Sequence, residues 1–210
     1  MIRRFVARAF ASSFIRHTTL LASGTVAANL ITLFMLPLFS RMYPPEAFGL
    51  QALLIMGTMA LATLATGYYD WAIPTPKTKK QAKELATLAL AFSTALTLLV
   101  ALLLLIFGQQ LLDALAIGSL KAWAYALPPL GLALAAYNIS NYWLLRAGKM
   151  ASLTQIRFIL PITNALVALV LGRMGYESGF VIGFIAGVIA CGAWGMWVAM
   201  RHGQIGRAHV

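Results

Sequence analysis

The sequence predicts an all-α membrane protein in which six helices cross the bilayer. Five segments of at least 23 residues contain no Asp, Glu, Lys or Arg, and a sixth, Ala151–Gly172, contains a single charge, Arg157. A helix needs about 20 apolar residues to cross a bilayer, so each segment is long enough. The five uncharged segments are Thr18–Ser40, Ala47–Tyr69, Leu85–Leu112, Ala122–Leu145 and Ser178–Met200.

The composition excludes a water-soluble domain. Hydrophobic residues make up 61% of the 210 residues, and the mean hydropathy is +0.83. Charged residues make up 10% of the chain, against roughly 25% in soluble domains. A β-barrel is also excluded, because its strands run about 10 residues with alternating polarity and these segments are longer and do not alternate.

The positive charges predict the orientation of the helices. The net charge is +11, and thirteen of the sixteen lysines and arginines lie in the terminal segments, in the connection 70–84 or around the connection after the fourth helix. The other three are Arg41, Lys121 and Arg173. Because lysine and arginine are enriched in cytoplasmic loops, we expect both termini in the cytoplasm. This pattern indicates contact with membrane lipids and excludes nucleic acid as a partner.

The first membrane helix is expected at 18–39, after an arginine-rich segment without acidic residues. We expect residues 1–17 to form an amphipathic lead-in helix on the cytoplasmic surface of the membrane. The membrane helix is expected to end near Pro37, and Pro44 prevents it from continuing into the next helix.

The second helix is expected at 47–69. Pro45 and Glu46 suit its first turn, because proline fits the start of a helix and a carboxylate is favoured at the helix N-terminus. The helix is expected to end at Gly67–Tyr69, where the aromatic side chains suit the membrane interface. The connection Asp70–Glu84 that follows is the longest polar stretch of the chain, and its prolines prevent a continuous helix.

The third helix is expected at 85–107, followed by a short interfacial helix within 108–121. The fourth helix is expected at 122–145. It contains Pro128 and Pro129, which should kink it because they leave backbone carbonyls without an N–H donor.

The fifth helix, 151–172, contains Pro161, and the sixth is expected at 178–200. In the sixth helix Gly179, Gly183 and Gly187 follow at four-residue spacing, a pattern that lets two membrane helices approach closely. Residues 201–210 are expected to form a cytoplasmic tail.

The sequence contains no catalytic or metal-binding constellation, so we expect a protein that is not an enzyme and needs no cofactor or metal. The three histidines lie at the membrane edge or in the tail without metal-ligand spacing. The five acidic residues form no pair, and neither a glycine-rich phosphate loop nor a nucleophile elbow is present. The single cysteine, Cys191, lies inside the sixth helix, so no internal disulfide can form.

Four asparagines lie within the expected membrane helices: Asn29, Asn138, Asn141 and Asn164. Such side chains often form hydrogen bonds between helices, worth about 0.6 kcal/mol each on average. The alternative is that they line a polar cavity, and Asn29, Asn138 and Asn164 are our candidates for that role.

Three charged residues are further candidates for the cavity. Arg157 lies about six residues inside the cytoplasmic end of its helix, roughly 9 Å deep at 1.5 Å per residue. It either extends back to the interface or anchors an anionic, phosphate-bearing substrate. Arg41 is an outer interfacial residue or meets phosphate at a cavity mouth, and Asp70 pairs with a cation or with a lysine of the following loop.

Three stretches resemble bacterial polysaccharide flippases of the Wzx type, which belong to the multidrug/oligosaccharidyl-lipid/polysaccharide exporter superfamily. Residues 37–49 are similar to that family's first turn, a Pro-Leu-x-Ser-Arg run followed by Tyr-x-Pro-Glu-x-Phe-Gly. Residues 68–76 are similar to its Arg-Tyr-Glu-x-Ala-Ile-x-x-Pro pattern, with Asp70 for glutamate and Tyr68 for arginine. Residues 141–158 are similar to its fourth-to-fifth turn.

The resemblance implies one lobe of a MATE-like two-lobed transporter in the bacterial inner membrane. Such proteins flip an isoprenoid-pyrophosphate-linked oligosaccharide between leaflets by alternating access, for the synthesis of surface polysaccharide or lipopolysaccharide. Cationic cavity residues hold the pyrophosphate, and polysaccharide-assembly proteins are possible partners. The alternatives are a drug/cation antiporter of the same superfamily, which needs buried carboxylates, and a membrane scaffold for envelope assembly that transports nothing.

The C-terminal residues lead us to expect that the chain is a fragment. Ile205–Val210, IGRAHV, are similar to the translation of a common sequencing adapter. We therefore expect the natural sequence to diverge after about Gln204, and further membrane helices to follow in the complete protein.

Overall fold

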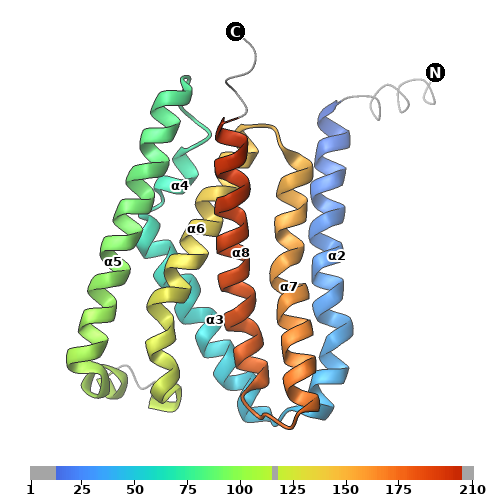
Figure 1. The fold of residues 1–210 in the computed structure, drawn as a ribbon, viewed down its shortest axis with the longest axis vertical. Coiled ribbons are helices and arrows are strands. Elements are labelled where there is room, and N and C mark those ends of the chain that lie inside the picture. Colours follow the sequence, from blue (N-terminus) through green and yellow to red (C-terminus); the bar gives the residue numbers. More distant parts are fainter. Residues whose placement is uncertain (1–12, 115–117, 205–210) are drawn as a thin grey trace.

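The computed structural model describes residues 13–114 and 118–204, which form helices and turns and no strand. Six of the helices are long and run roughly along one direction (Figure 1). They are α2 (Ser13–Met42), α3 (Pro45–Thr66), α5 (Lys79–Ala114), α6 (Leu127–Arg146), α7 (Met150–Arg173) and α8 (Gly179–Gln204). Two short elements join them, the four-residue helix α4 (Tyr69–Ala72) and the 3₁₀ helix η1 (Gly118–Ala126).

Five of the long helices are apolar enough to cross a membrane, and the chain is a multi-pass membrane protein. These segments are Ser23–Met42, Pro45–Thr66, Lys79–Gln110, Met150–Arg173 and Gly179–Arg201. Helix α6 has 20 residues, among them Asn138, Ser140 and Asn141, and is not one of these five segments. A sixth crossing at α6 therefore stays a prediction, and so does the assignment of the bundle to a MATE-like lobe.

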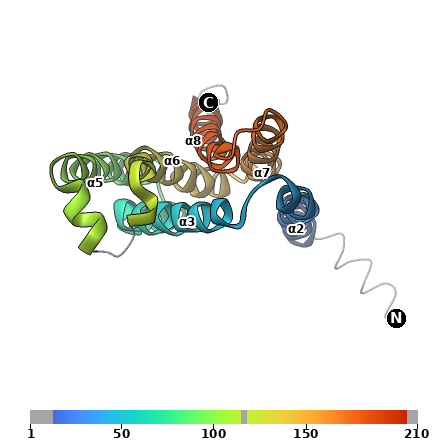
Figure 2. The same cartoon turned by 90° about the horizontal axis from the view of Figure 1, so that it is seen from below.

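Helices α6 and α8 form the centre of the bundle. Helix α8 packs against α6 and α7, and α6 also packs against α3 and α5. Helices α2 and α5 lie at opposite ends of the arrangement (Figure 2). The largest buried cluster lies between α3, α6 and α8 and includes Leu54, Leu130 and Phe184.

The glycines of α8 bring its backbone against α7, as the four-residue spacing predicts. A Cβ atom on Gly183 would lie 2.8 Å from the Asn164 carbonyl oxygen, and one on Gly187 would lie 2.9 Å from the Leu160 carbonyl oxygen. Both neighbours are backbone atoms of α7, so no side chain larger than hydrogen fits there without separating the helices.

The turn between α2 and α3 is fixed by aromatic packing. Phe39 and Tyr43 pack against Phe180 of α8, with ring centroids 5.3 Å from Phe180 in both cases. The Tyr43 hydroxyl donates a hydrogen bond to the Ala168 carbonyl of α7. Pro45 then begins α3 with Glu46 in its first turn, which confirms the predicted start of the second helix.

Two predictions about prolines are wrong. Helix α2 does not end near Pro37 but continues through it to Met42, because one proline removes one backbone hydrogen bond and a long membrane helix tolerates that loss. Pro128 and Pro129 do not kink a helix but lie in the first turn of α6. The N–H groups of a first turn have no partner within the helix in any case, so the prolines set where α6 starts, after η1.

Helix α5 begins earlier than predicted, and it is kinked at the predicted end of the third helix. It begins at Lys79, where the Gln81 N–H donates to the Thr78 hydroxyl, and runs to Ala114 with a break in helical geometry at Phe107 (φ −119°, ψ 18°). The kink at Phe107 divides α5 into a long helix and a short one over 108–114, as expected from a third helix that ends at 107 and a separate short helix within 108–121. The location of that short helix at the membrane interface stays a prediction. The second helix ends as predicted, with Gly67 in the left-handed conformation (φ 52°) after Thr66.

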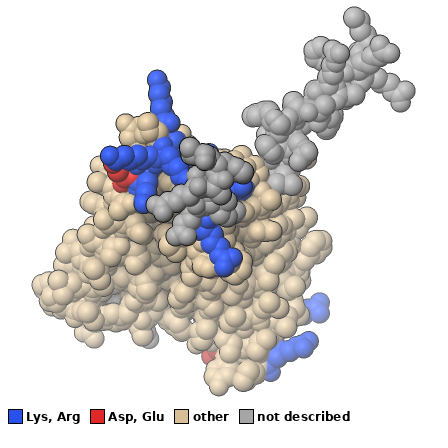
Figure 3. All heavy atoms as spheres, turned by 45° about the horizontal axis from the view of Figure 1, so that its top comes forward, with Lys and Arg blue, Asp and Glu red and all other residues tan. Residues whose placement is uncertain are grey.

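Lysines and arginines gather at the end of the bundle where α2 begins and α8 ends (Figure 3). The connection before α5, the turn between α6 and α7, and the last turn of α8 all lie at this end, which we call the basic end. It carries Lys77, Lys79, Lys80, Lys83, Arg146, Lys149 and Arg201, whereas Arg41 and Arg173 lie at the opposite end. The expected lead-in is described only from Ser13, where α2 already begins, and residues 205–210 lie outside the described residues.

Candidate binding pocket

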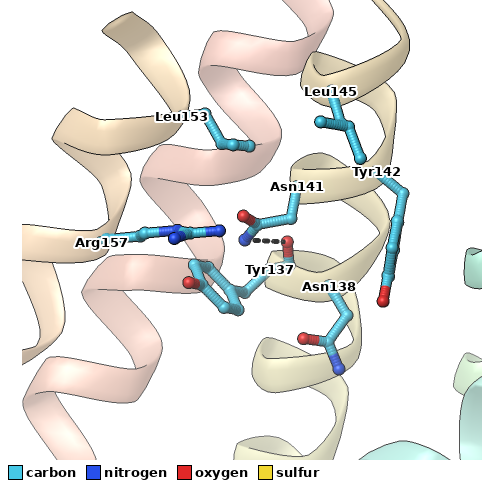
Figure 4. Close-up of a pocket in the computed structure, with 7 residues that line it drawn as sticks. All are labelled: Tyr137, Asn138, Asn141, Tyr142, Leu145, Leu153 and Arg157. Carbon is cyan, nitrogen blue, oxygen red and sulfur yellow. Dashed lines mark hydrogen bonds between the residues drawn. The ribbon is translucent and has the colours of Figure 1, made fainter. Parts of the chain in front are cut away.

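A pocket of about 260 Å³ lies between α6 and α7, near the basic end (Figure 4). Helix α6 contributes most of its lining, and α7 contributes the only charge among the lining residues. The seven lining residues are Tyr137, Asn138, Asn141, Tyr142, Leu145, Leu153 and Arg157.

The lining residues of α6 share one face because of their spacing. Positions 137, 138, 141, 142 and 145 follow at intervals of one, three or four residues, which places them together on a helix. The Asn141 amide nitrogen donates a hydrogen bond of 3.2 Å to the Tyr137 carbonyl, which fixes the orientation of that side chain. The pocket wall is therefore a polar stripe on an otherwise apolar helix.

Arg157 extends from α7 toward Asn141 and Tyr137 (Figure 4). Its Nη1 donates a hydrogen bond to the Thr25 hydroxyl of α2, so its guanidinium joins three helices. Helix α2 comes close enough because Gly24 faces Thr154 of α7, where a Cβ atom would collide with the threonine methyl group.

The charge of Arg157 has no acidic neighbour in the pocket lining. The side chain is half-buried, none of the seven lining residues is Asp or Glu, and its described hydrogen-bond acceptor is a neutral hydroxyl. An arginine keeps its charge at any ordinary pH and offers five N–H donors. The pocket therefore presents unneutralised positive charge together with amide and phenol groups, which is the chemistry of an anion site.

The structure brings only two of the six predicted site residues together, Arg157 and Asn138. Asn29 is exposed on α2, and Arg41 is exposed at the opposite end of the bundle. Asn164 lies against the glycines of α8, and its Oδ1 is buried without a hydrogen-bond partner. A role in substrate binding stays a prediction for all of them.

Asp70, the sixth predicted residue, lies outside the pocket but next to its wall. It is 2% exposed on α4, and its Oδ1 has no hydrogen-bond partner. Burial raises the pKa of this carboxyl above its usual value of 3.8, partly offset by a hydrogen bond from the Thr66 side chain. The neighbouring Trp71 packs on Tyr142 of the pocket, with ring centroids 6.2 Å apart, so α4 supports that wall.

The chain matches no protein-family model, no curated protein and no solved structure. Its function must therefore be inferred from its own residues and geometry.

Sequence reasoning missed Arg146, which organises the connection before α5. Its guanidinium donates hydrogen bonds to the carbonyls of Pro74 (3.0 Å), Thr78 (3.2 Å) and Ile73 (3.5 Å). The role of Arg146 could not be predicted, because in the sequence it is one of several basic residues at helix ends and the carbonyls that accept its hydrogen bonds are about 70 positions away. Tyr137 was missed as well, because a tyrosine in an apolar helix gives no signal of a pocket.

Proposed function

We propose that this chain forms one lobe of a transporter that flips an isoprenoid-pyrophosphate-linked oligosaccharide across the bacterial inner membrane. The observation that carries the proposal is Arg157, a half-buried cation without an acidic partner in a polar pocket of an apolar bundle. Ionisable residues within membrane helices are costly and mark substrate or ion pathways. The resemblance of residues 37–49 and 68–76 to polysaccharide flippases selects this substrate among anionic lipids.

The size of the pocket fits a charged group and not a whole substrate. Its volume of about 260 Å³ lies just below the roughly 300–1,000 Å³ of pockets that enclose a drug-sized ligand. In this proposal the pyrophosphate replaces the Thr25 hydroxyl as the acceptor for Arg157, and the amides of Asn138 and Asn141 donate further hydrogen bonds. The isoprenoid chain and the sugars lie outside the pocket.

The position of the pocket fits loading from the inner leaflet. Arg157 lies seven residues after Met150, about 10 Å along α7 at 1.5 Å per residue. In the proposal the basic end lies in the cytoplasm, so the pocket is near the cytoplasmic surface of the membrane. Release to the outer leaflet requires the pocket to open toward the other end, which is the alternating-access step. In the proposal a second lobe covers the exposed apolar surfaces, such as Phe34 of α2, which is 75% exposed.

A cation antiporter is the second candidate, and Asp70 is the observation that favours it. A buried carboxylate with an unpartnered oxygen is a natural site for a proton or a cation. Asp70 lies on α4, outside the five apolar helices, which ranks this function below the flippase.

The proposal is tested by measuring leaflet exchange in liposomes that contain the protein. The probe is a fluorescent isoprenoid-pyrophosphate disaccharide, and its exposure is measured with a membrane-impermeant quencher. We expect faster exchange than in protein-free liposomes, and loss of this acceleration in Arg157→Gln. Equal rates with and without protein exclude the flippase, and proton-driven cation uptake that requires Asp70 supports the antiporter instead.

A further inference from the structure

The first turns of α5 combine a cluster of lysines with a shallow apolar groove. The groove has a volume of about 360 Å³ and is lined by Lys83, Glu84, Thr87, Leu88 and Ala91. All five residues come from α5 and are exposed. Helix α5 lies at one end of the arrangement of helices (Figure 2), and the exposure of these five residues leaves the groove open to the surroundings of the bundle.

The groove continues into an apolar stripe along the same helix. Leu88, Leu98, Leu102 and Leu105 are 50%, 65%, 54% and 72% exposed. They recur at intervals that keep residues on one helix face. A hydrocarbon chain that lies along this stripe has its polar end at Lys83, at the basic end of the bundle.

The charges above the groove are almost all positive. Residues 77–84 contain four lysines and one glutamate, all exposed, which gives a net charge of +3. Figure 3 shows lysine and arginine atoms gathered at the basic end, where α5 begins. This arrangement of positive charge above an apolar groove is complementary to an anionic phospholipid, whose phosphate lies above its acyl chains.

Arg146 fixes the segment that leads into these lysines. It binds the carbonyls of Pro74 and Thr78 on either side of Lys77, and the Thr78 hydroxyl caps the start of α5. Ile73 is fully buried against Ala89 and Ile139. The lysines are therefore presented from an ordered segment, which lowers the entropy cost of binding one lipid at a defined position.

We propose that the first turns of α5 form a binding site for an anionic membrane phospholipid, with Lys80 and Lys83 at the phosphate and Leu88 and Ala91 along an acyl chain. The Glu84 carboxylate repels the lipid phosphate and so lowers the affinity of the site for the lipid. This site is separate from the pocket at Arg157, and it does not depend on the transport proposal.

The test counts phospholipids bound to the purified chain by native mass spectrometry in detergent, with phosphatidylglycerol and phosphatidylcholine as probes. A lysine near the membrane surface contributes about fivefold in affinity for anionic lipid. We therefore expect Lys80→Gln/Lys83→Gln to bind phosphatidylglycerol roughly 25-fold more weakly. Lys149→Gln, in the turn between α6 and α7, is the matched control and should leave the affinity unchanged.

Two further variants separate the parts of the site. Glu84→Gln should strengthen binding of phosphatidylglycerol, because it removes the one negative charge beside the groove. Ala91→Trp should fill the groove and weaken binding while every lysine is kept. Equal affinity for phosphatidylcholine and phosphatidylglycerol, or an unchanged affinity in the double lysine variant, overturns the proposal.

Discussion

Replacing Gly183 with alanine should destabilise the bundle, whereas the same replacement at Gly49 should stabilise it. Both glycines are helical, so both replacements gain about 0.5–1 kcal/mol of helix stability. At Gly49 a Cβ atom meets nothing within 4 Å. At Gly183 it would lie 2.8 Å from both the backbone and the side-chain oxygen of Asn164 and 3.1 Å from the Ala168 Cβ.

The difference between the two variants isolates the steric cost at the contact of α7 and α8. Overpacking of a close contact costs about 1–3 kcal/mol, and the backbone oxygen of Asn164 cannot move aside without moving α7. We therefore expect Gly183→Ala to be about 1–3 kcal/mol less stable than Gly49→Ala, since the gain in helix propensity cancels between them.

The assay is the free energy of unfolding in mixed micelles, measured by titration with a denaturing detergent and followed by tryptophan fluorescence. Circular dichroism of each variant before titration checks that the starting helix content is the same. Equal stability of the two variants would refute the close packing of α7 on α8.

The remaining predictions concern the basic end. Arg146→Ala removes the donor to three carbonyls, so hydrogen exchange within residues 73–78 should accelerate at least tenfold, while Lys149→Ala leaves it unchanged. Burial raises the pKa of Asp70 in the folded protein above its usual value of 3.8. At a pH between 3.8 and the raised pKa, the folded state therefore binds more protons than the unfolded state. Stability should therefore fall as the pH rises through that window, and Asp70→Asn should remove this dependence and be more stable at pH 7. A wild-type stability that rises with pH in that window counts against a buried Asp70.

The sequence predicted most helix positions because a bilayer demands long uncharged segments. The charge-free runs locate α3 and α8 to within a few residues, and the run that contains only Arg157 locates α7 equally well. The errors at Pro37 and at Pro128 have one cause. A proline is compatible with a helix start, a helix interior or a helix end, and only the tertiary position of its neighbours decides between them.

The pocket was predictable only in part. A lone arginine in an apolar segment is energetically costly and therefore indicates a functional site. For this reason the sequence alone identified Arg157 as a candidate. Its proximity to Thr25 depends on how closely α2 approaches α7 at Gly24, and no local pattern contains that information. The same holds for Asn164, which lies in the contact of α7 with α8 and not in the pocket.

If the pocket at Arg157 binds a pyrophosphate, the protein should bind a short isoprenoid pyrophosphate through that arginine. Farnesyl pyrophosphate is titrated into the protein in nanodiscs by calorimetry, with farnesol as the neutral probe. A hydrogen bond to a charged group contributes about 1.5–3 kcal/mol, so Arg157→Gln should weaken binding roughly tenfold to a hundredfold, and Arg157→Lys should weaken it less.

Arg173→Gln, at the other end of the same helix, is the matched control and should bind as the wild type does. We expect tight binding of farnesyl pyrophosphate, weak binding of farnesol, and a loss of affinity only when Arg157 is replaced. Equal affinities of the wild type and Arg157→Gln for farnesyl pyrophosphate would contradict a pyrophosphate site at Arg157.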